Sequence, residues 1–245
     1  LAGDFEPARV ITVTEPVQGP WSPIWFGDAT DGVYLRAGYV DGNSSLVSDQ
    51  RLDDATIHMI LGGSTGQGKS VTLNSIIYGL CSEYAPWEVS LALCDAKIVE
   101  FKAYALETPL PHIRSIAATG DSDYLVSVLQ SVLDEMNKLQ SVFALAGAQK
   151  ISEFREKTGL CFPQHIIIID EFQTMFMNAK KRKNEIAEIL NKIIRLGRNA
   201  GYHLILASQE LGSDITPEMI SNIQVRAAMG CLTGNVSEKI LGNDG

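Results

Sequence analysis

A glycine-rich turn between a predicted strand and a predicted helix is the feature that most constrains this chain. Residues 57–72 read IHMILGGSTGQGKSVT, and residues 63–70 match the pattern G-x-x-x-x-G-K-[S/T] at every fixed position. The run before the turn is typical of a buried strand, and the residues after it recur at helical spacing. The apolar residues of that predicted helix are Val71, Leu73, Ile76, Ile77 and Leu80. This context favours a phosphate-binding loop over a chance glycine turn.

Each fixed position of the turn has a mechanical role in binding a phosphate. Gly63, Gly66 and Gly68 allow backbone turns closed to residues with a Cβ, so that successive N–H groups can face an anion. The helix that begins near Lys69 adds its positive N-terminal partial charge. We expect Lys69 to reach the β- and γ-phosphates of ATP and the Ser70 hydroxyl to ligate Mg²⁺. The predicted nucleotide-binding residues are Gly63, Ser64, Thr65, Gly66, Gln67, Gly68, Lys69, Ser70 and Val71.

The run HIIIIDEF at 165–172 supplies the acids that such a site needs. Four consecutive isoleucines are typical of a parallel strand buried on both faces. Open α/β sheets bind ligands at the carboxyl ends of their strands. We therefore expect Asp170 to complete the Mg²⁺ shell and Glu171 to act as general base toward the attacking water. The structural alternative is a buried strand followed by a capping acid, whereas the acid pair predicts hydrolysis rather than nucleotide storage.

Composition fits one α/β domain of generous size with a small appendage. The chain has 245 residues, is 45% hydrophobic and 20% charged, and carries a net charge of −9. That charge argues against a surface that is basic throughout, but not against a narrow basic pore. No apolar run approaches the ~20 residues that span a bilayer, and no signal peptide opens the chain. Because it begins at Leu1, we expect a piece of a longer protein, in which any membrane anchor lies outside these residues.

The cysteines and histidines show neither metal-ligand nor disulfide spacing. The cysteines are widely spaced and mostly in apolar contexts, which is typical of a protein of the reducing cytoplasm. The histidines flank predicted strands, so we expect buried or strand-edge positions for them. The residues concerned are Cys81, Cys94, Cys161 and Cys231, and His58, His112, His165 and His203.

Strand and helix patterns divide the chain at about residue 55. Residues 1–55 contain two strand-like runs, 8–14 and 33–40, and predict a small β-rich entry module lying against the main sheet. Residues 56–245 alternate strands and helices, which predicts an α/β P-loop NTPase core with a mostly parallel sheet. Beyond the phosphate loop the expected strands are 88–96, 112–118, 164–170, 201–208 and 224–230, and the expected helices are 122–145, 149–158, 184–197 and 216–223.

Polar residues at the ends of a strand and a helix are further candidates. Gln209 follows the strand 201–208 and is placed to hydrogen-bond the γ-phosphate or the lytic water, or is simply a polar strand end. Arg195 and Arg198 end a helix whose apolar face is predicted to pack inward. Arginines there also complement the helix dipole, which is a sufficient structural reason for one of them.

The order and spacing of these segments resemble the FtsK/SpoIIIE family of motor ATPases. The segments that carry the resemblance are GGSTGQGKS, CDAKIVEF, LPHI, HIIIIDEF, GRNAGYHLILASQ and ITPEMISNIQVR, within about residues 57–241. The resemblance implies a RecA-like core that forms homo-hexameric rings and uses ATP and Mg²⁺ to thread a polymer, usually double-stranded DNA, through a pore. A sister branch, the EccC-type ATPases of type VII secretion, moves protein substrates instead. Residues 95–101, DAKIVEF, look more like the DNA branch.

The resemblance also implies basic residues that act on a neighbour or on the polymer. An arginine finger acts in trans in such motors, and our candidates are Arg198 and Arg226, the latter equally a solvated strand residue. The run Lys180, Lys181, Arg182 and Lys183 corresponds to a pore-lining loop of the DNA branch, or is an ordinary solvated loop. Phosphate contacts by this run would be independent of sequence and sensitive to salt.

Overall fold

A computed structural model describes most of the chain beyond residue 24. The described residues are 25–40, 43–64, 66–106, 110–179, 182–209, 216–230, 238, 240 and 241. The predicted strand at 8–14 lies outside them, as do Thr65, Lys180 and Lys181 of the candidate sites.

Six strands form the central sheet, in the order β5-β4-β6-β7-β3-β8. Their bounds are β3 (Met59–Gly62), β4 (Val89–Asp95), β5 (Ile113–Ala118), β6 (Gln164–Asp170), β7 (Tyr202–Ser208) and β8 (Val225–Ala228). Every neighbouring pair is parallel, which confirms the predicted sheet. Strand β7 lies between the phosphate-loop strand β3 and the acid-bearing strand β6. The segment that follows β7 therefore emerges between the phosphate loop and the acids.

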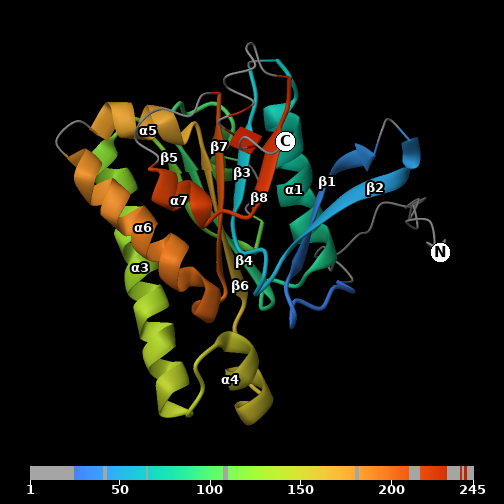
Figure 1. Ribbon diagram of the computed structural model, residues 1–245, viewed down its shortest axis with the longest axis vertical. Helices are drawn as coiled ribbons and strands as arrows, with labels where there is room; N and C mark the ends of the chain where they lie inside the picture. The colour runs from blue at the N-terminus through green and yellow to red at the C-terminus, as the bar shows by residue number, and fades with distance from the viewer. Residues whose placement is uncertain are drawn as a thin grey trace.

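Helices cover both faces of this sheet (Figure 1). One layer contains α3 (Ser122–Leu145), α5 (Phe172–Ala179), α6 (Lys183–Ala200) and α7 (Pro217–Ser221), and α1 (Lys69–Glu83) lies on the opposite face. Two short helices, α2 (Lys102–Leu106) and α4 (Ile151–Thr158), complete the described set. In Figure 1, α4 lies beyond the lower end of the sheet.

The isoleucines of β6 show how the sheet is buried on both faces. Ile167 and Ile169 belong to the hydrophobic cluster that includes α3, α5 and α6, whereas Ile166 and Ile168 belong to the cluster that includes α1. Successive side chains of a strand point to opposite faces, so an uninterrupted apolar run serves both clusters. The prediction of a strand buried on both faces is confirmed.

A two-stranded antiparallel sheet packs on the outer side of α1. It consists of β1 (Val33–Val40) and β2 (Asn43–Leu52). Its buried residues join the same hydrophobic cluster as α1. The guanidinium of Arg36 donates to the carboxylate of Glu83 from Nε at 3.0 Å and from Nη2 at 3.1 Å. In its described part the N-terminal module thus rests on a helix that itself covers the main sheet. The division into two domains at residue 55 stays a prediction.

The apolar face of α1 differs from the predicted one at its first turn. Val71 is 70% exposed, whereas Thr72 is buried beside Leu73. The remaining predicted residues of that face, Ile76, Ile77 and Leu80, are fully buried. Val71 was expected to pack inward, but its position one residue before Thr72 turns it to the outside of the helix.

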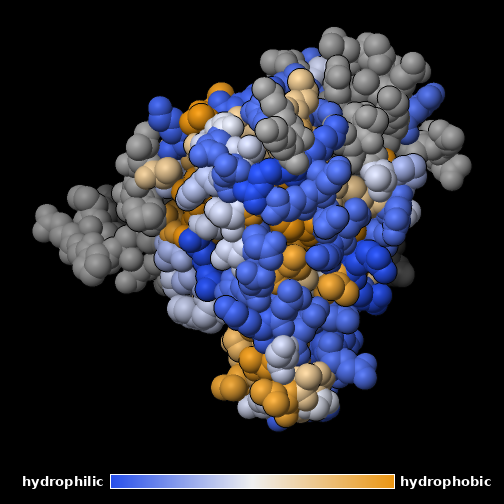
Figure 2. All heavy atoms as spheres, turned by 90° about the vertical axis from the view of Figure 1, so that its left-hand side faces the viewer, coloured by the Kyte–Doolittle hydropathy of each residue, from blue (hydrophilic) through white to orange (hydrophobic). Residues whose placement is uncertain are grey.

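The outer face of α3 and α6 is mostly hydrophilic (Figure 2). Apolar side chains gather at its lower end, where α3 ends and α4 lies, and Leu145 and Leu160 are 90% and 61% exposed there. Among the described residues no helix combines the length and the hydropathy needed to cross a membrane.

Candidate nucleotide site

The phosphate loop lies between the end of β3 and the start of α1, at the carboxyl ends of the strands. Gly66 and Gly68 have φ angles of +79° and +94°, which side chains with a Cβ rarely adopt. Gly63 is needed for a different reason, because a Cβ there would lie 2.9 Å from the Cβ of Met229. The first N–H groups of α1 have no partner within the helix and are available to an anion.

The segment after β8 braces this loop from the side. The N–H of Met229 donates to the carbonyl of Gly62 at 2.8 Å, and the N–H of Ser64 donates to the carbonyl of Gly230 at 3.1 Å. A Cβ on Gly230 would lie 2.3 Å from the side-chain oxygen of Gln67. Neither Met229 nor Gly230 was predicted from sequence, because no motif marks a residue that acts only by close backbone contact.

Lys69 joins the phosphate loop to both predicted acids. Its ammonium contacts the Asp170 carboxylate and lies 2.9 Å from Oε1 of Glu171. All three side chains are less than 10% exposed. Three charges buried this deeply must be paired, since an unpaired buried charge is costly. The two acids were 101 and 102 residues away in sequence, and parallel pairing across β6, β7 and β3 brings them to the lysine.

The pKa values of the three groups follow from burial and from their mutual charges. Burial favours neutral Lys69, but the hydrogen bonds and charges of Asp170 and Glu171 outweigh it, so its pKa lies above the ordinary value. Burial raises the pKa of Asp170, and Lys69 offsets this only in part. Burial also favours the neutral form of Glu171, yet contacts with Lys69 and then Lys97 hold its pKa below the usual range. Glu171 is therefore an ionised carboxylate in a nearly dry site.

Three further side chains reach this cluster from neighbouring segments. Gln209, just beyond β7, donates from Nε2 to Oε1 of Glu171 at 3.0 Å. Lys97, beyond β4, places its ammonium 3.2 Å from Oε2 of the same carboxylate. The hydroxyl of Ser70 donates to Oε1 of Glu100 at 2.6 Å. The position of Gln209 agrees with its predicted place beside the site, whereas Lys97 and Glu100 were not assigned a role from sequence.

The oxygen donors of this site suit Mg²⁺. Mg²⁺ takes oxygen ligands and is usually held by one or two carboxylates together with waters and substrate phosphates. The Ser70 hydroxyl, next to Lys69 in sequence, and the Asp170 carboxylate, which contacts the Lys69 ammonium, supply such donors. No group of three or more His, Cys, Asp or Glu side chains that could hold a metal ion by themselves occurs in the described part of the chain. The donor set fits an ion that arrives with its nucleotide.

Comparison with known proteins identifies the family. The model of the FtsK/SpoIIIE family matches residues 36–213, which is more than half of the chain. The chain belongs to the FtsK/SpoIIIE family. The DNA translocase FtsK of Streptococcus pneumoniae is 32% identical over 202 residues, covering 77% of this chain and 25% of that protein. The DNA translocase FtsK of Helicobacter pylori is 32% identical over 193 residues, covering 77% and 22%. The chain thus spans about a quarter of the length of these relatives.

Two solved structures share the fold. The cytoplasmic domain of EccC, a type VII secretion ATPase of Thermomonospora curvata, superposes with a TM-score of 0.70 at 22% identity, covering 89% of this chain and 26% of that one. The pCW3 conjugation coupling protein TcpA superposes with a TM-score of 0.65 at 20% identity, covering 91% and 61%. At these identities the likeness shows the fold alone, and it confirms the predicted RecA-like P-loop core.

The two candidate arginines of this FtsK/SpoIIIE chain differ in their surroundings. Arg226 on β8 donates to the carbonyls of Ile220 at 3.0 Å and Ile223 at 3.3 Å, at the end of α7. Arg198 is exposed near the end of α6, and its guanidinium makes no hydrogen bond or ion pair with any residue that the structure describes. It lies at the amino ends of the strands, at the opposite edge of the sheet from the phosphate loop. It therefore cannot complete the site of its own chain.

The described part of the basic run is engaged in ion pairs. Arg182 donates to Oδ1 of Asp123 at 2.8 Å and to both carboxylate oxygens of Glu185, at 2.7 and 2.8 Å. Lys183 begins α6. Arg182 thus ties the start of α6 to the start of α3, a role that sequence reasoning did not assign to it. The predicted contact of this run with a phosphate backbone stays untested.

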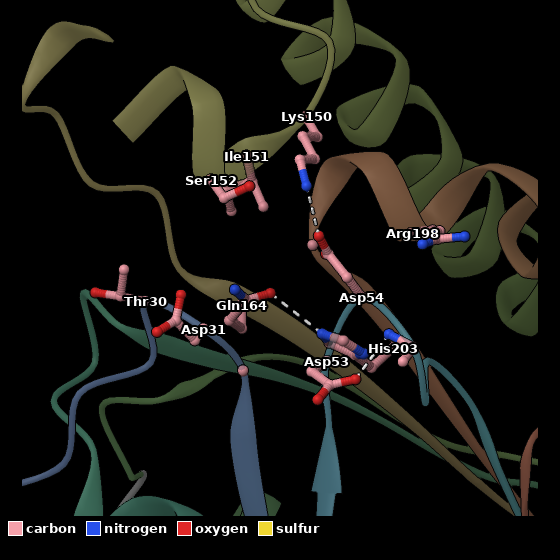
Figure 3. Close-up of a pocket in the computed structure, with 13 residues that line it drawn as sticks. Thr30, Asp31, Asp53, Asp54, Lys150, Ile151, Ser152, Gln164, Arg198 and His203 are labelled. Carbon is pink, nitrogen blue, oxygen red and sulfur yellow. Dashed lines mark hydrogen bonds and ion pairs between the residues drawn. The ribbon is translucent and has the colours of Figure 1, made fainter. Parts of the chain in front are cut away.

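A cavity of about 290 Å³ lies at the amino ends of the strands, away from the phosphate loop (Figure 3). Lys150 pairs with Asp54 at 2.9 Å across its upper rim, and Gln164 contacts His203 at 3.1 Å at its floor. Arg198 points along its edge in Figure 3. The polar groups on its floor bond one another or the backbone, so nothing in its lining marks it as the chemical site.

Proposed function

We propose that this chain is an ATP-hydrolysing motor domain that moves double-stranded DNA. The observation that carries the proposal is the convergence of Lys69, Asp170, Glu171 and Gln209 at one edge of the sheet. Asp170 and Glu171 come from the end of β6, Gln209 from the end of β7 and Lys69 from the helix after β3. Each has the chemistry that a P-loop ATPase requires.

ATP binding would redistribute the contacts of the site. The residues from Gly63 to Val71 bind the phosphates, and Lys69 exchanges the carboxylates of Asp170 and Glu171 for the β- and γ-phosphates. Ser70 and Asp170 would hold Mg²⁺, which would supply positive charge against the phosphates. Glu171, ionised and no longer paired with Lys69, then accepts a proton from the attacking water. Gln209 already bonds this carboxylate and is placed to sense loss of the γ-phosphate.

DNA is favoured as the polymer because the curated relatives that match over three quarters of this chain are named DNA translocases. We propose that the run from Lys180 to Lys183 contacts the phosphate backbone in a ring pore. Arg182 pairs with Asp123 and Glu185, so its contact with a phosphate would replace one of these bonds. The alternative is transport of protein substrates, as in the secretion branch, and the test below distinguishes it from movement of DNA.

A homo-hexamer is proposed as the working assembly, acting in the cytoplasm. A head-to-tail ring places the same surface of each subunit against a different surface of the next. Arg198 lies at the edge opposite the phosphate loop and is free to reach a neighbour's γ-phosphate in such a contact. Arg226 also remains a candidate, but its bonds to the end of α7 give it a structural role within its own subunit.

The test is the ATPase rate with and without duplex DNA at two salt concentrations. The proposal predicts stimulation by DNA of any sequence, weaker at the higher salt because phosphate contacts release counterions. Replacing residues 180–183 by serine should reduce DNA affinity and flatten its salt dependence while basal hydrolysis persists. Lys192→Ser, an exposed change on α6, is the matched control. ATP hydrolysis that is indifferent to DNA but stimulated by a peptide would favour the secretion branch.

A further inference from the structure

The segment that follows β4 is wrapped around one buried carboxylate. Asp95 is fully buried, and its two side-chain oxygens accept hydrogen bonds from five consecutive backbone N–H groups. The N–H groups of residues 97 and 98 donate to Oδ1 at 2.9 and 3.0 Å, and those of residues 99, 100 and 101 donate to Oδ2 at 2.8, 2.8 and 3.3 Å. The position of this segment, 96–101, is therefore fixed by the sheet itself.

This arrangement forces an unusual backbone conformation. Ile98 has a φ of +61°, a region that a β-branched residue rarely enters. Glu171 has a φ of +52°. Among the described residues, these two are the only non-glycine residues with positive φ, and both lie at the nucleotide site. Strain of this kind persists only where the surroundings over-determine it, and the five bonds to Asp95 do so here.

The strained turn presents two side chains to the nucleotide site. The ammonium of Lys97 lies 3.2 Å from Oε2 of Glu171, and the carboxylate of Glu100 accepts the Ser70 hydroxyl at 2.6 Å. One segment thus contacts both the proposed general base and a proposed Mg²⁺ ligand. A surface turn that served packing alone would not need to reach two groups of the site.

We propose that Lys97 is a positioning residue for ATP hydrolysis, which holds the Glu171 carboxylate after Lys69 has turned to the phosphates. The role rests on the proposed ATPase function. Oε1 of Glu171 is shared by Lys69 and Gln209, whereas Oε2 is held by Lys97. When Lys69 leaves, Gln209 and Lys97 anchor one oxygen each, and Lys97 is the remaining cation. Without it the carboxylate can rotate away from the attacking water.

Single-turnover ATP hydrolysis by Lys97→Met and Lys97→Arg, in the whole chain, tests the proposal. For Lys97→Met we expect a rate about tenfold lower and an unchanged Kd for ATP. Lys97→Arg keeps the charge and should restore part of the rate. Lys102→Met, five residues further along and exposed on α2, is the matched control and should behave as the wild type.

Two results would overturn the proposal without touching the ATPase assignment. One is a Lys97→Met protein that hydrolyses ATP at the wild-type rate. The other is an equal loss of rate in both variants, which would indicate a structural role. A wild-type chain that binds ATP but does not hydrolyse it would instead overturn the proposed function and the role of Lys97 with it. The ¹³C chemical shift of the Glu171 carboxyl, measured with ADP bound, should change in Lys97→Met and not in Lys102→Met, which reports the contact independently of turnover.

Discussion

The two ends of the strands in the central sheet, here called the carboxyl edge and the amino edge, bury different kinds of polar group. At the carboxyl edge, Lys69 is enclosed with two carboxylates, and Lys97 reaches the same cluster. At the amino edge, four buried histidines lie just before or near the start of a strand. They are His58, His112, His165 and His203, and their buried positions agree with the prediction.

The difference lies in how each group is held. His58 accepts from the N–H of Leu204 at Nδ1 and contacts the carbonyl of Ile194 at Nε2, so one neutral tautomer satisfies both neighbours. The charges of the carboxyl edge depend instead on one another and are fixed by strained backbone at residues 98 and 171. Neutral, backbone-bonded groups indicate stability, and mutually dependent charges indicate a site whose contacts can be exchanged for those of a ligand.

Arg198 does not fit this comparison, because it lies at the amino edge and yet is proposed to take part in ATP hydrolysis. Arg198→Ala should lower the ATPase rate of the assembled protein by about 10³-fold or more, as loss of an arginine finger does. Its melting temperature should not change, since the side chain is exposed. Arg226→Ala should instead lower the stability by about 1 kcal/mol through its lost bonds to the end of α7.

Mixing subunits tests whether Arg198 acts across an interface. An Arg198→Ala protein mixed with a Lys69→Ala protein should regain some activity, because hybrid interfaces pair an intact phosphate site with an intact arginine. If Arg198→Ala retains the wild-type rate in an assembly of defined size, the amino edge has no chemical role in this reaction.

Asp95 shows that not every buried acid at the carboxyl edge is expected to act in catalysis, because its role is structural. Asp95→Asn replaces one acceptor oxygen by an amide that faces two or three N–H donors. The free energy of unfolding should fall by about 2–3 kcal/mol, the usual cost of leaving buried donors without partners. Chemical denaturation measures it. Asp121→Asn, at the exposed N-cap of α3, is the matched control and should change stability by less than about 0.5 kcal/mol, since Asn caps equally well.

The sequence predicted the strongly periodic elements and the local part of the site. Helix α3 and strand β6 have their predicted bounds, and the apolar face of α6 is buried as expected. Strand β2 was missed, because NSSLVSDQRL alternates weakly and pairs with β1 by a register that no local pattern shows. Motif spacing predicted Lys69, Asp170 and Glu171. Each of their expected roles accepts only one or two types of residue, so such residues recur in a recognisable pattern.

The rest of the site depends on long-range geometry. Lys97 and Glu100 reach the site because Asp95 gathers the backbone of five residues behind it, and a hydrogen-bonded turn of this kind has no sequence period. Met229 and Gly230 act through backbone contacts, for which side-chain identity gives little signal. The pairing of Arg182 with Asp123 joins residues 59 apart and was likewise invisible in the sequence.

The smallest expected effect is on the pH dependence of the free energy of unfolding, to which the buried histidines of the amino edge contribute. Burial lowers the pKa of His58 to about 4 and that of His165 to about 3. The unfolded chain therefore binds protons that the folded chain excludes when the pH falls below about 6.5. Each histidine should weaken stability by on the order of 1 kcal/mol between pH 6.5 and 5. Denaturation at these two pH values should show a smaller drop for His58→Gln. The control Glu156→Gln, an exposed change on α4, should match the wild type.

Glu171→Gln tests the central claim most directly, when ATP binding and single-turnover hydrolysis are measured on the same protein. The change removes the base but keeps Asp170 and the phosphate loop. The account predicts an ATP affinity close to that of the wild type and hydrolysis slower by about 10²–10⁴-fold, so that ATP stays bound. Lys69→Ala, measured alongside, should lose affinity for ATP instead. Hydrolysis at the wild-type rate by Glu171→Gln would contradict the assignment of the carboxyl edge as the catalytic site.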